Sequence, residues 1–182
     1  MRKIFYLIFI ILALLVALLP IKVSAENGKR SVRVVTIPEG SVVEGNFVIK
    51  AGESVEISGE VNGEVIVAGG EVLVDGKING DLLAAGGTVK ISGEVTQDVR
   101  VAGGQVTISG IVGGNITVAS GNVEISDSAK IGGGIVAFAG NTLFSGSVSK
   151  DMYIFGGGVT LAGEVNGKVN AFVDTLNITY KA

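Results

Sequence analysis

The sequence predicts an all-β fold, a right-handed parallel β-helix with triangular coils, because of a fixed repeat, its apolar positions and its glycines. A 17-residue unit recurs along the chain, and 29 of the 182 residues are glycine. A fixed period of this length is typical of a solenoid in which each repeat forms one coil. We expect seven to eight coils, and the units begin at Gly59, Gly76, Gly93, Gly110, Asp127 (19 residues), Gly146 and Gly163.

Five positions of each unit, numbered from its first residue, are apolar with Thr142 as the exception. Apolar and polar residues alternate around them, which is the period of a strand with one buried face. We therefore expect these positions to point inward, with Val101 and Ile108 buried and Arg100 and Thr107 exposed. In the first unit, positions 3, 7, 9, 14 and 16 are Val61, Val65, Val67, Val72 and Val74.

Glycine fills positions 1, 5 and 12 of most units. Since glycine readily adopts positive φ, we expect corners there that divide each coil into three short strands. The two extra residues of the Asp127 unit fall in a polar stretch, residues 126–130, which predicts a loop.

The regular units are flanked by less regular segments. Residues 40–58 resemble a degenerate first coil, in which four apolar residues match the repeat: Val48, Ile49, Val55 and Ile57. We expect the β-helix to span residues 40–182 and residues 26–39 to form an N-terminal cap or linker.

The first 25 residues are typical of a signal peptide. Arg2 and Lys3 precede an unbroken apolar run over residues 4–19, and small residues at Val23 and Ala25 fit cleavage before Glu26. The alternative is an uncleaved membrane anchor over residues 4–21. Either interpretation predicts an exported protein, located outside the cell or in the cell envelope.

Composition excludes several functions. The chain has no histidine and no cysteine, so it lacks the usual ligands of zinc and the common catalytic nucleophile–histidine pairs. Cleavage would remove three of 14 basic residues and none of the 17 acidic ones, so the net charge would change from −3 to −6. Such a surface disfavours nucleic acid. We expect no enzyme activity, no cofactor and no metal.

One feature keeps a glycan-cleaving or glycan-binding function open as an alternative. Acidic residues recur at position 6, one residue past a corner, where stacked carboxylates could serve glycoside hydrolysis. A solvated acidic edge is the simpler interpretation. The residues concerned are Glu64, Asp81, Asp98 and Asp151.

Aromatic residues gather in the C-terminal units. Position 10 is alanine in four units and then Phe138, Phe155 and Phe172, while position 8 contributes Val136 and Tyr153. Strand alternation predicts that these side chains face outward as a surface contact patch. The alternative is that the chain turns at this corner and buries the rings.

The last unit suggests a second contact site. Only four residues follow Ile178, too few to cover the end of a β-helix, whose last coil presents apolar side chains and unpaired backbone groups. We expect Leu176 and Ile178 to stack against another molecule, and the alternative is that the chain is a fragment of a longer protein.

Units such as Gly-Glu-Val-Asn-Gly-Glu-Val-Ile-Val-Ala-Gly-Gly-Glu-Val (residues 59–72) resemble those of the bactofilins, polymer-forming bacterial cytoskeletal proteins. The resemblance covers residues 40–179 and is nearest to exported relatives that carry a signal sequence. It implies a right-handed β-helix, nucleotide-free polymerisation end to end and a scaffolding role at the cell envelope. The expected partners are further copies of the chain, with membrane or cell-wall components in addition.

Overall fold

The computed structural model describes residues 34–179, and for residues 49–52 only the backbone. Two parallel sheets of nine and eight strands make up this part of the chain. The first sheet contains β1 (Val34–Ile37), β3 (Phe47–Ile57), β5 (Val65–Val74), β7 (Leu82–Ile91), β9 (Val99–Ile108), β11 (Ile116–Ile125), β13 (Ile135–Phe144), β15 (Met152–Leu161) and β17 (Val169–Ile178). The second contains β2 (Val42–Glu44), β4 (Glu60–Asn62), β6 (Lys77–Ile78), β8 (Glu94–Val95), β10 (Ile111–Val112), β12 (Lys130–Ile131), β14 (Ser147–Val148) and β16 (Glu164–Val165).

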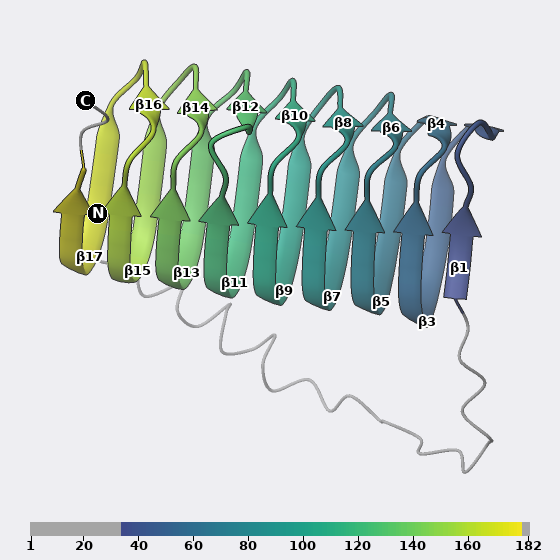
Figure 1. Ribbon diagram of the computed structural model, residues 1–182, viewed down its shortest axis with the longest axis horizontal. Helices are drawn as coiled ribbons and strands as arrows, with labels where there is room; N and C mark the ends of the chain where they lie inside the picture. Colours follow the sequence, from purple (N-terminus) through teal and green to yellow (C-terminus); the bar gives the residue numbers. More distant parts are fainter. Residues whose placement is uncertain (1–33, 180–182) are drawn as a thin grey trace, which may run out of the picture. The chain divides into compact units, whose positions relative to one another are not determined.

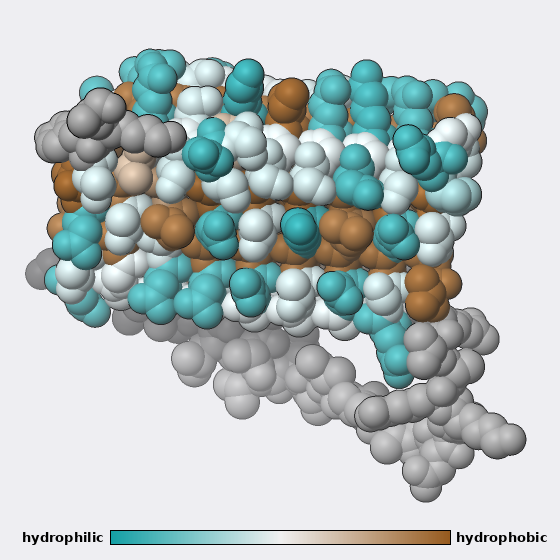
Figure 2. All heavy atoms as spheres, in the orientation of Figure 1, coloured by the Kyte–Doolittle hydropathy of each residue, from teal (hydrophilic) through white to brown (hydrophobic). Residues whose placement is uncertain are grey.

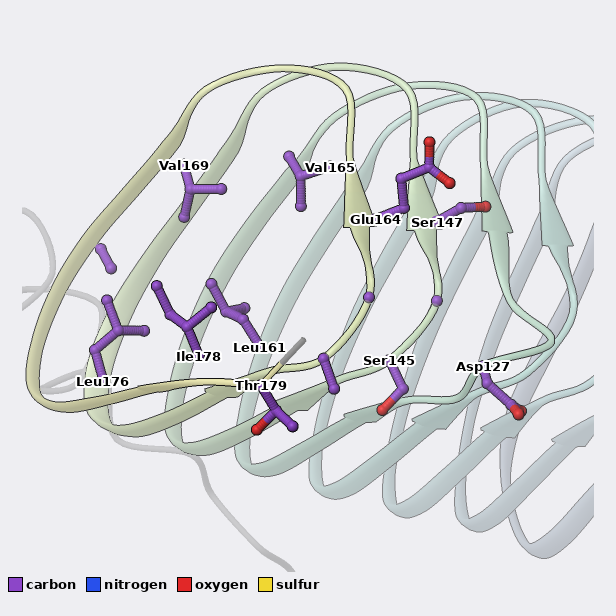
Figure 3. A pocket seen from close by; sticks show the side chains of 14 residues that line it. Asp127, Ser145, Ser147, Leu161, Glu164, Val165, Val169, Leu176, Ile178 and Thr179 are labelled. Carbon is purple, nitrogen blue, oxygen red and sulfur yellow. The ribbon is translucent and has the colours of Figure 1, made fainter. Parts of the chain in front are cut away.

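The predicted fold class is confirmed, because consecutive coils stack in register as a parallel β-helix. Each residue lies beside the residue 17 positions later, as Val65 lies beside Leu82. The offset becomes 19 between β11 and β13, where Asp127 and Ser128 form an exposed turn at the predicted loop. Figure 1 shows β1 and β17 at opposite ends of the stack. Seen from β17 in Figure 3, the chain runs counterclockwise as the coils approach the viewer, which is a right-handed turn.

The core fills the space inside the coils, and the predicted inward positions are confirmed through Leu161. Val101 is 4% exposed and Ile108 is 0% exposed, whereas Arg100 is exposed. Thr107 is partly exposed rather than fully so. Narrow ladders of valine and isoleucine therefore form one continuous hydrophobic core.

Each coil contains two strands, not the three short strands that the glycine positions predicted. In β5, Val65 and Val67 point inward, and after the glycine pair Val72 and Val74 do so. The inward-facing residues are therefore odd-numbered before the glycine pair and even-numbered after it. The strand turns a corner at this point without losing its pairing with β7. Every long strand therefore has a first and a second half that form different sides of the coil.

The corner glycines are needed for close packing between coils. The sequence-based expectation that they adopt positive φ is wrong. Among the described glycines only Gly40 and Gly45 have positive φ, at 79° and 89°. By contrast, a Cβ atom on Gly93 would overlap the carbonyl oxygen of Gly76, one coil below, and one on Gly110 would overlap that of Gly93. Glycine occupies position 1 because neighbouring coils leave no room for a side chain.

The N-terminal coil begins earlier than predicted and in a different register. Residues 34–37, expected in a cap or linker, form β1 and pair with β3. Phe47 rather than Val48 pairs with Val65 and packs against the core, and Val48 is 56% exposed. Val55 and Ile57 are buried as expected. The side chain of Ile49 and the predicted signal segment lie outside the described residues.

Candidate functional site

The last coil exposes positions that are buried in the coils before it from β5 onward. Leu176 is 43% exposed, whereas Val159, the residue that precedes it in the same ladder, is 2% exposed. Val169 and Ile178 are exposed as well, and Val165 and Ala171 are partly buried. Since each coil of a solenoid is covered by its neighbours, the end that follows β17 is an uncovered section through the core.

These residues line a hollow at the end of the β-helix with a volume of about 810 Å³. Figure 3 shows the side chains of Val165, Val169, Leu161 and Ile178 directed toward the inside of the coil. Both predicted end residues, Leu176 and Ile178, belong to this lining. Asp127, Ser147 and Glu164 are among the polar residues that complete the lining. The hollow is therefore lined by apolar core side chains and by polar residues, and it opens on the side where a further coil would lie.

Backbone groups are also left unpaired at this end. The amide of the first residue in each long strand donates to the carbonyl of the following coil, as Met152 N–H does to the Lys168 oxygen at 2.8 Å. The equivalent amide of Val169 has no following coil among the described residues. Among the strands of residues 34–179, β17 pairs with β15 alone, so within this part of the chain it is an edge strand with free donors and acceptors.

The aromatic residues of the C-terminal coils lie on the outside of the β-helix, as strand alternation predicted. The ring centroids of Phe138 and Phe155 are 5.0 Å apart, and those of Phe155 and Phe172 are 5.1 Å apart, both pairs stacked. Phe138 is 46% exposed and Phe172 is 65% exposed. Tyr153 is exposed beside them, and Val136 is partly buried.

This aromatic ladder is one part of a longer surface that the sequence analysis did not identify. The first halves of the strands from β5 to β17 present an outward surface with a single charged residue, here called the apolar face. The sequence did contain a sign of this surface, because position 8, which alternation places outward, holds the apolar residues Ile66 and Leu83 in consecutive units. The apolar face consists of Ile66, Ala68, Leu83, Ala85, Arg100, Ala102, Thr117, Ala119, Val136, Phe138, Tyr153, Phe155, Asn170 and Phe172.

The second halves of the same strands form a contrasting surface, here called the polar face. Its outward residues include Glu71, Lys90, Gln105 and Glu124, with Leu143 as an isolated exposed apolar residue. Figure 2 shows this side of the molecule, where hydrophilic and neutral residues predominate and hydrophobic ones are scattered. The two halves of each strand therefore face solvent with different chemistry.

The three aspartates at position 6 bind the backbone of the next coil, whereas the Glu64 carboxylate accepts no such hydrogen bond in the described structure. Asp98 Oδ1 accepts the Asn115 amide at 2.8 Å, Asp81 Oδ1 accepts the Asp98 amide at 3.0 Å, and Asp151 Oδ1 accepts the Lys168 amide at 2.9 Å. Arg100 adds ion pairs of 3.3 Å to Asp81 and 3.2 Å to Asp98. A carboxylate that accepts a backbone amide joins two coils at a corner.

The remaining polar features offer little chemistry. Thr142 Oγ1 is buried and has no hydrogen-bond partner in the described structure. Within residues 34–179 no group of acidic side chains is arranged to hold a metal ion, and no helix there is long and apolar enough to cross a membrane.

No family model matches the chain, and neither a curated protein nor a solved structure was found that resembles it significantly. The candidate site is therefore defined by its geometry: an open apolar end at β17 and an apolar face along the β-helix.

Proposed function

We propose that the protein is an exported structural protein that assembles end to end into polymers and acts as a scaffold at the cell envelope. The observation that carries this proposal is the exposure of the core positions of β17, which are buried in the long strands from β5 to β15. The resemblance of the repeat to the bactofilins points to the same kind of assembly. Its location rests on the predicted signal segment, residues 1–25.

A second copy is the partner that the open end fits best. Another coil placed on β17 would cover Leu176 and Ile178 and accept hydrogen bonds from amides such as that of Val169. Fully burying one such side chain is worth about 1.5–3 kcal/mol, and each backbone hydrogen bond adds about 0.5–1.5 kcal/mol. Since both contributions are short-ranged and uncharged, we expect assembly without nucleotide and at high salt.

Sedimentation velocity and negative-stain microscopy of residues 26–182 test this proposal. Wild-type protein should form rods that lengthen with concentration, whereas Leu176→Lys should remain monomeric because the charge cannot be buried in a joint. Leu143→Lys is the matched control, since Leu143 is 42% exposed, nearly the same as Leu176, but lies on the polar face. A wild-type protein that stays monomeric, or forms dimers and nothing longer, would contradict the polymer.

The alternative, a surface protein that binds or cleaves glycans, has less support. The position 6 carboxylates of Asp81, Asp98 and Asp151 are engaged by backbone amides, which accounts for their presence without catalysis. The substitution Asp81→Asn keeps an oxygen that can accept the Asp98 amide. Cleavage of an acidic polysaccharide by the wild type that is lost in Asp81→Asn would therefore favour the alternative.

A further inference from the structure

The apolar face is a large surface without a partner among the described residues. Its four alanines are exposed, as are Ile66, Leu83, Phe138, Tyr153 and Phe172. A predominantly apolar surface of this kind, next to the polar face of the same strands, indicates an interaction site. It lies along the side of the β-helix, so it is separate from the end at which we propose polymerisation.

We propose that this face pairs two copies of the chain side by side, with the two β-helices antiparallel. The thickness of the face changes along its length: position 10 is alanine from β5 to β11 and phenylalanine from β13 to β17. A two-fold axis between β11 and β13 would set Phe138 opposite Ala119 of the second copy and Phe155 opposite Ala102. The bulky half of each copy then fills the shallow half of the other, as isologous packing requires.

Parallel pairing lacks this complementarity. It would place the aromatic coils of both copies at the same level, so that Tyr153 of one copy would meet Phe155 of the other. The rings would hold the sheets apart there, and the alanine coils would be left separated by a gap. Gaps between sheets lose dispersion contacts, so the antiparallel arrangement is favoured.

The single charge of the face fits the same arrangement. Arg100 and Tyr153 lie at equal distances on either side of the proposed axis, in β9 and β15, and both occupy position 8. Antiparallel pairing would therefore bring the guanidinium of each copy opposite the Tyr153 ring of the other, where a cation–π contact is favourable. Arg100 keeps its ion pairs with Asp81 and Asp98 at the corner, and no like charges meet.

The geometry of the rings favours protein over carbohydrate as the occupant. Sugars stack on the flat faces of aromatic rings, but Phe155 has a ring parallel to its own on each side, at 5.0 and 5.1 Å. The ladder therefore presents ring edges, which insert between small side chains. A face with one cation also offers little attraction to anionic lipid headgroups.

The size of the contact determines how pairing should be detected. With the axis between β11 and β13, six coils of each copy overlap. At about 4.8 Å per coil and about 13 Å per half-strand, the overlap is on the order of 400 Å² per copy. This is about half of a standard interface, so an isolated pair should dissociate readily. Chemical cross-linking captures such a contact, and copies joined into polymers would pair more strongly because many contacts act together.

Cross-linking at single cysteines tests both the pairing and its direction, because the chain has no cysteine of its own. Ala119→Cys and Ala85→Cys place the thiol at position 10 of the same exposed column. In the antiparallel pair the two Cα atoms would be about 11 Å apart at position 119 and about 26 Å apart at position 85. A short bismaleimide added to the full-length chain should therefore give a dimer band with Ala119→Cys and lose it with Ala85→Cys.

Two further variants complete the experiment. Thr160→Cys, on the polar face, should give no dimer, and adding Phe155→Glu to Ala119→Cys should abolish the dimer. The cross-link should persist when Leu176→Lys is combined with Ala119→Cys, so failure of end-to-end assembly is distinguishable from failure of side-by-side pairing. Equal dimer yields at positions 85 and 119 would overturn the antiparallel arrangement. Protection of Ala119→Cys from a monofunctional maleimide without a dimer, or its burial in phosphatidylcholine vesicles, would overturn the proposal by indicating another occupant.

Discussion

Ile108 and Ile178 occupy the same position of the repeat, in an inner coil and in the last coil, yet they are 0% and 57% exposed. Both point into the coil, and both belong to long strands with the same pairing to the coil before them. The difference arises from the following coil, which covers Ile108 and is missing beyond Ile178 in the described residues. In this fold the repeat determines the direction of a side chain, and the next coil determines its burial.

The largest difference in stability should come from placing a charge at this position in the inner coil and in the last coil. Ile108→Lys would bury an ammonium group without a partner, and we expect it to cost at least 4–5 kcal/mol, roughly enough to prevent folding. Ile178→Lys should change the stability of the dilute monomer by less than about 1 kcal/mol. Thermal unfolding followed by circular dichroism measures both, and equal losses would contradict the comparison.

Substitution of a corner glycine should destabilise an inner coil and the last coil to the same extent. The reason is that these glycines contact the preceding coil, which is present in both cases. A Cβ atom on Gly110 would overlap the carbonyl oxygen of Gly93, and one on Gly163 would overlap that of Gly146. We expect Gly110→Ala and Gly163→Ala each to destabilise the fold by about 1–3 kcal/mol. Urea denaturation of both variants checks this, and a harmless Gly163→Ala would show that the last coil is loosely attached.

Removal of a position 6 carboxylate should have a moderate effect. Asp98→Ala loses the hydrogen bonds to the Asn115 amide and side chain, at 2.8 and 3.1 Å, and we expect a loss of about 1–2 kcal/mol. Asp98→Asn keeps an acceptor oxygen and should cost less, since the half-exposed Arg100 ion pair contributes little. Tm values of the two variants provide the measurement. Similar losses would assign the effect to charge instead of to the backbone hydrogen bond.

The smallest expected effect is a gain in stability. Thr142 is the buried polar exception in a ladder formed by Val123, Val159 and their equivalents, and its hydroxyl has no partner. Thr142→Val should stabilise the protein by about 1 kcal/mol, because the hydroxyl no longer has to leave water. Thr160→Val, on the polar face, is the control and should leave the Tm nearly unchanged. An unaltered Tm in Thr142→Val would indicate that the hydroxyl is hydrogen-bonded in solution.

The sequence predicted the fold and the inward positions because a constant period repeats the same information in every coil. It misplaced the first coil because the offset there is 18 rather than 17 at Phe47, and β1 pairs at an offset of 20. It also assigned the corner glycines to positive φ, since the lack of space between coils depends on the coil below. The sequence aligned the four alanines with the three phenylalanines at position 10, but it did not identify the apolar face, because the exposure of Ile66 and Leu83 beside these alanines is evident only in the structure.

Amide hydrogen exchange at the start of the last two long strands tests the central claim, end-to-end assembly through β17, most directly. Met152 donates its amide to the next coil, whereas Val169, at the same position of the repeat, depends on a second copy. Our account predicts that exchange at Val169 slows toward that of Met152 as the protein concentration rises, and that Leu176→Lys prevents this change. Exchange at Val169 that stays fast at every concentration, while Met152 is protected, would contradict assembly through this end.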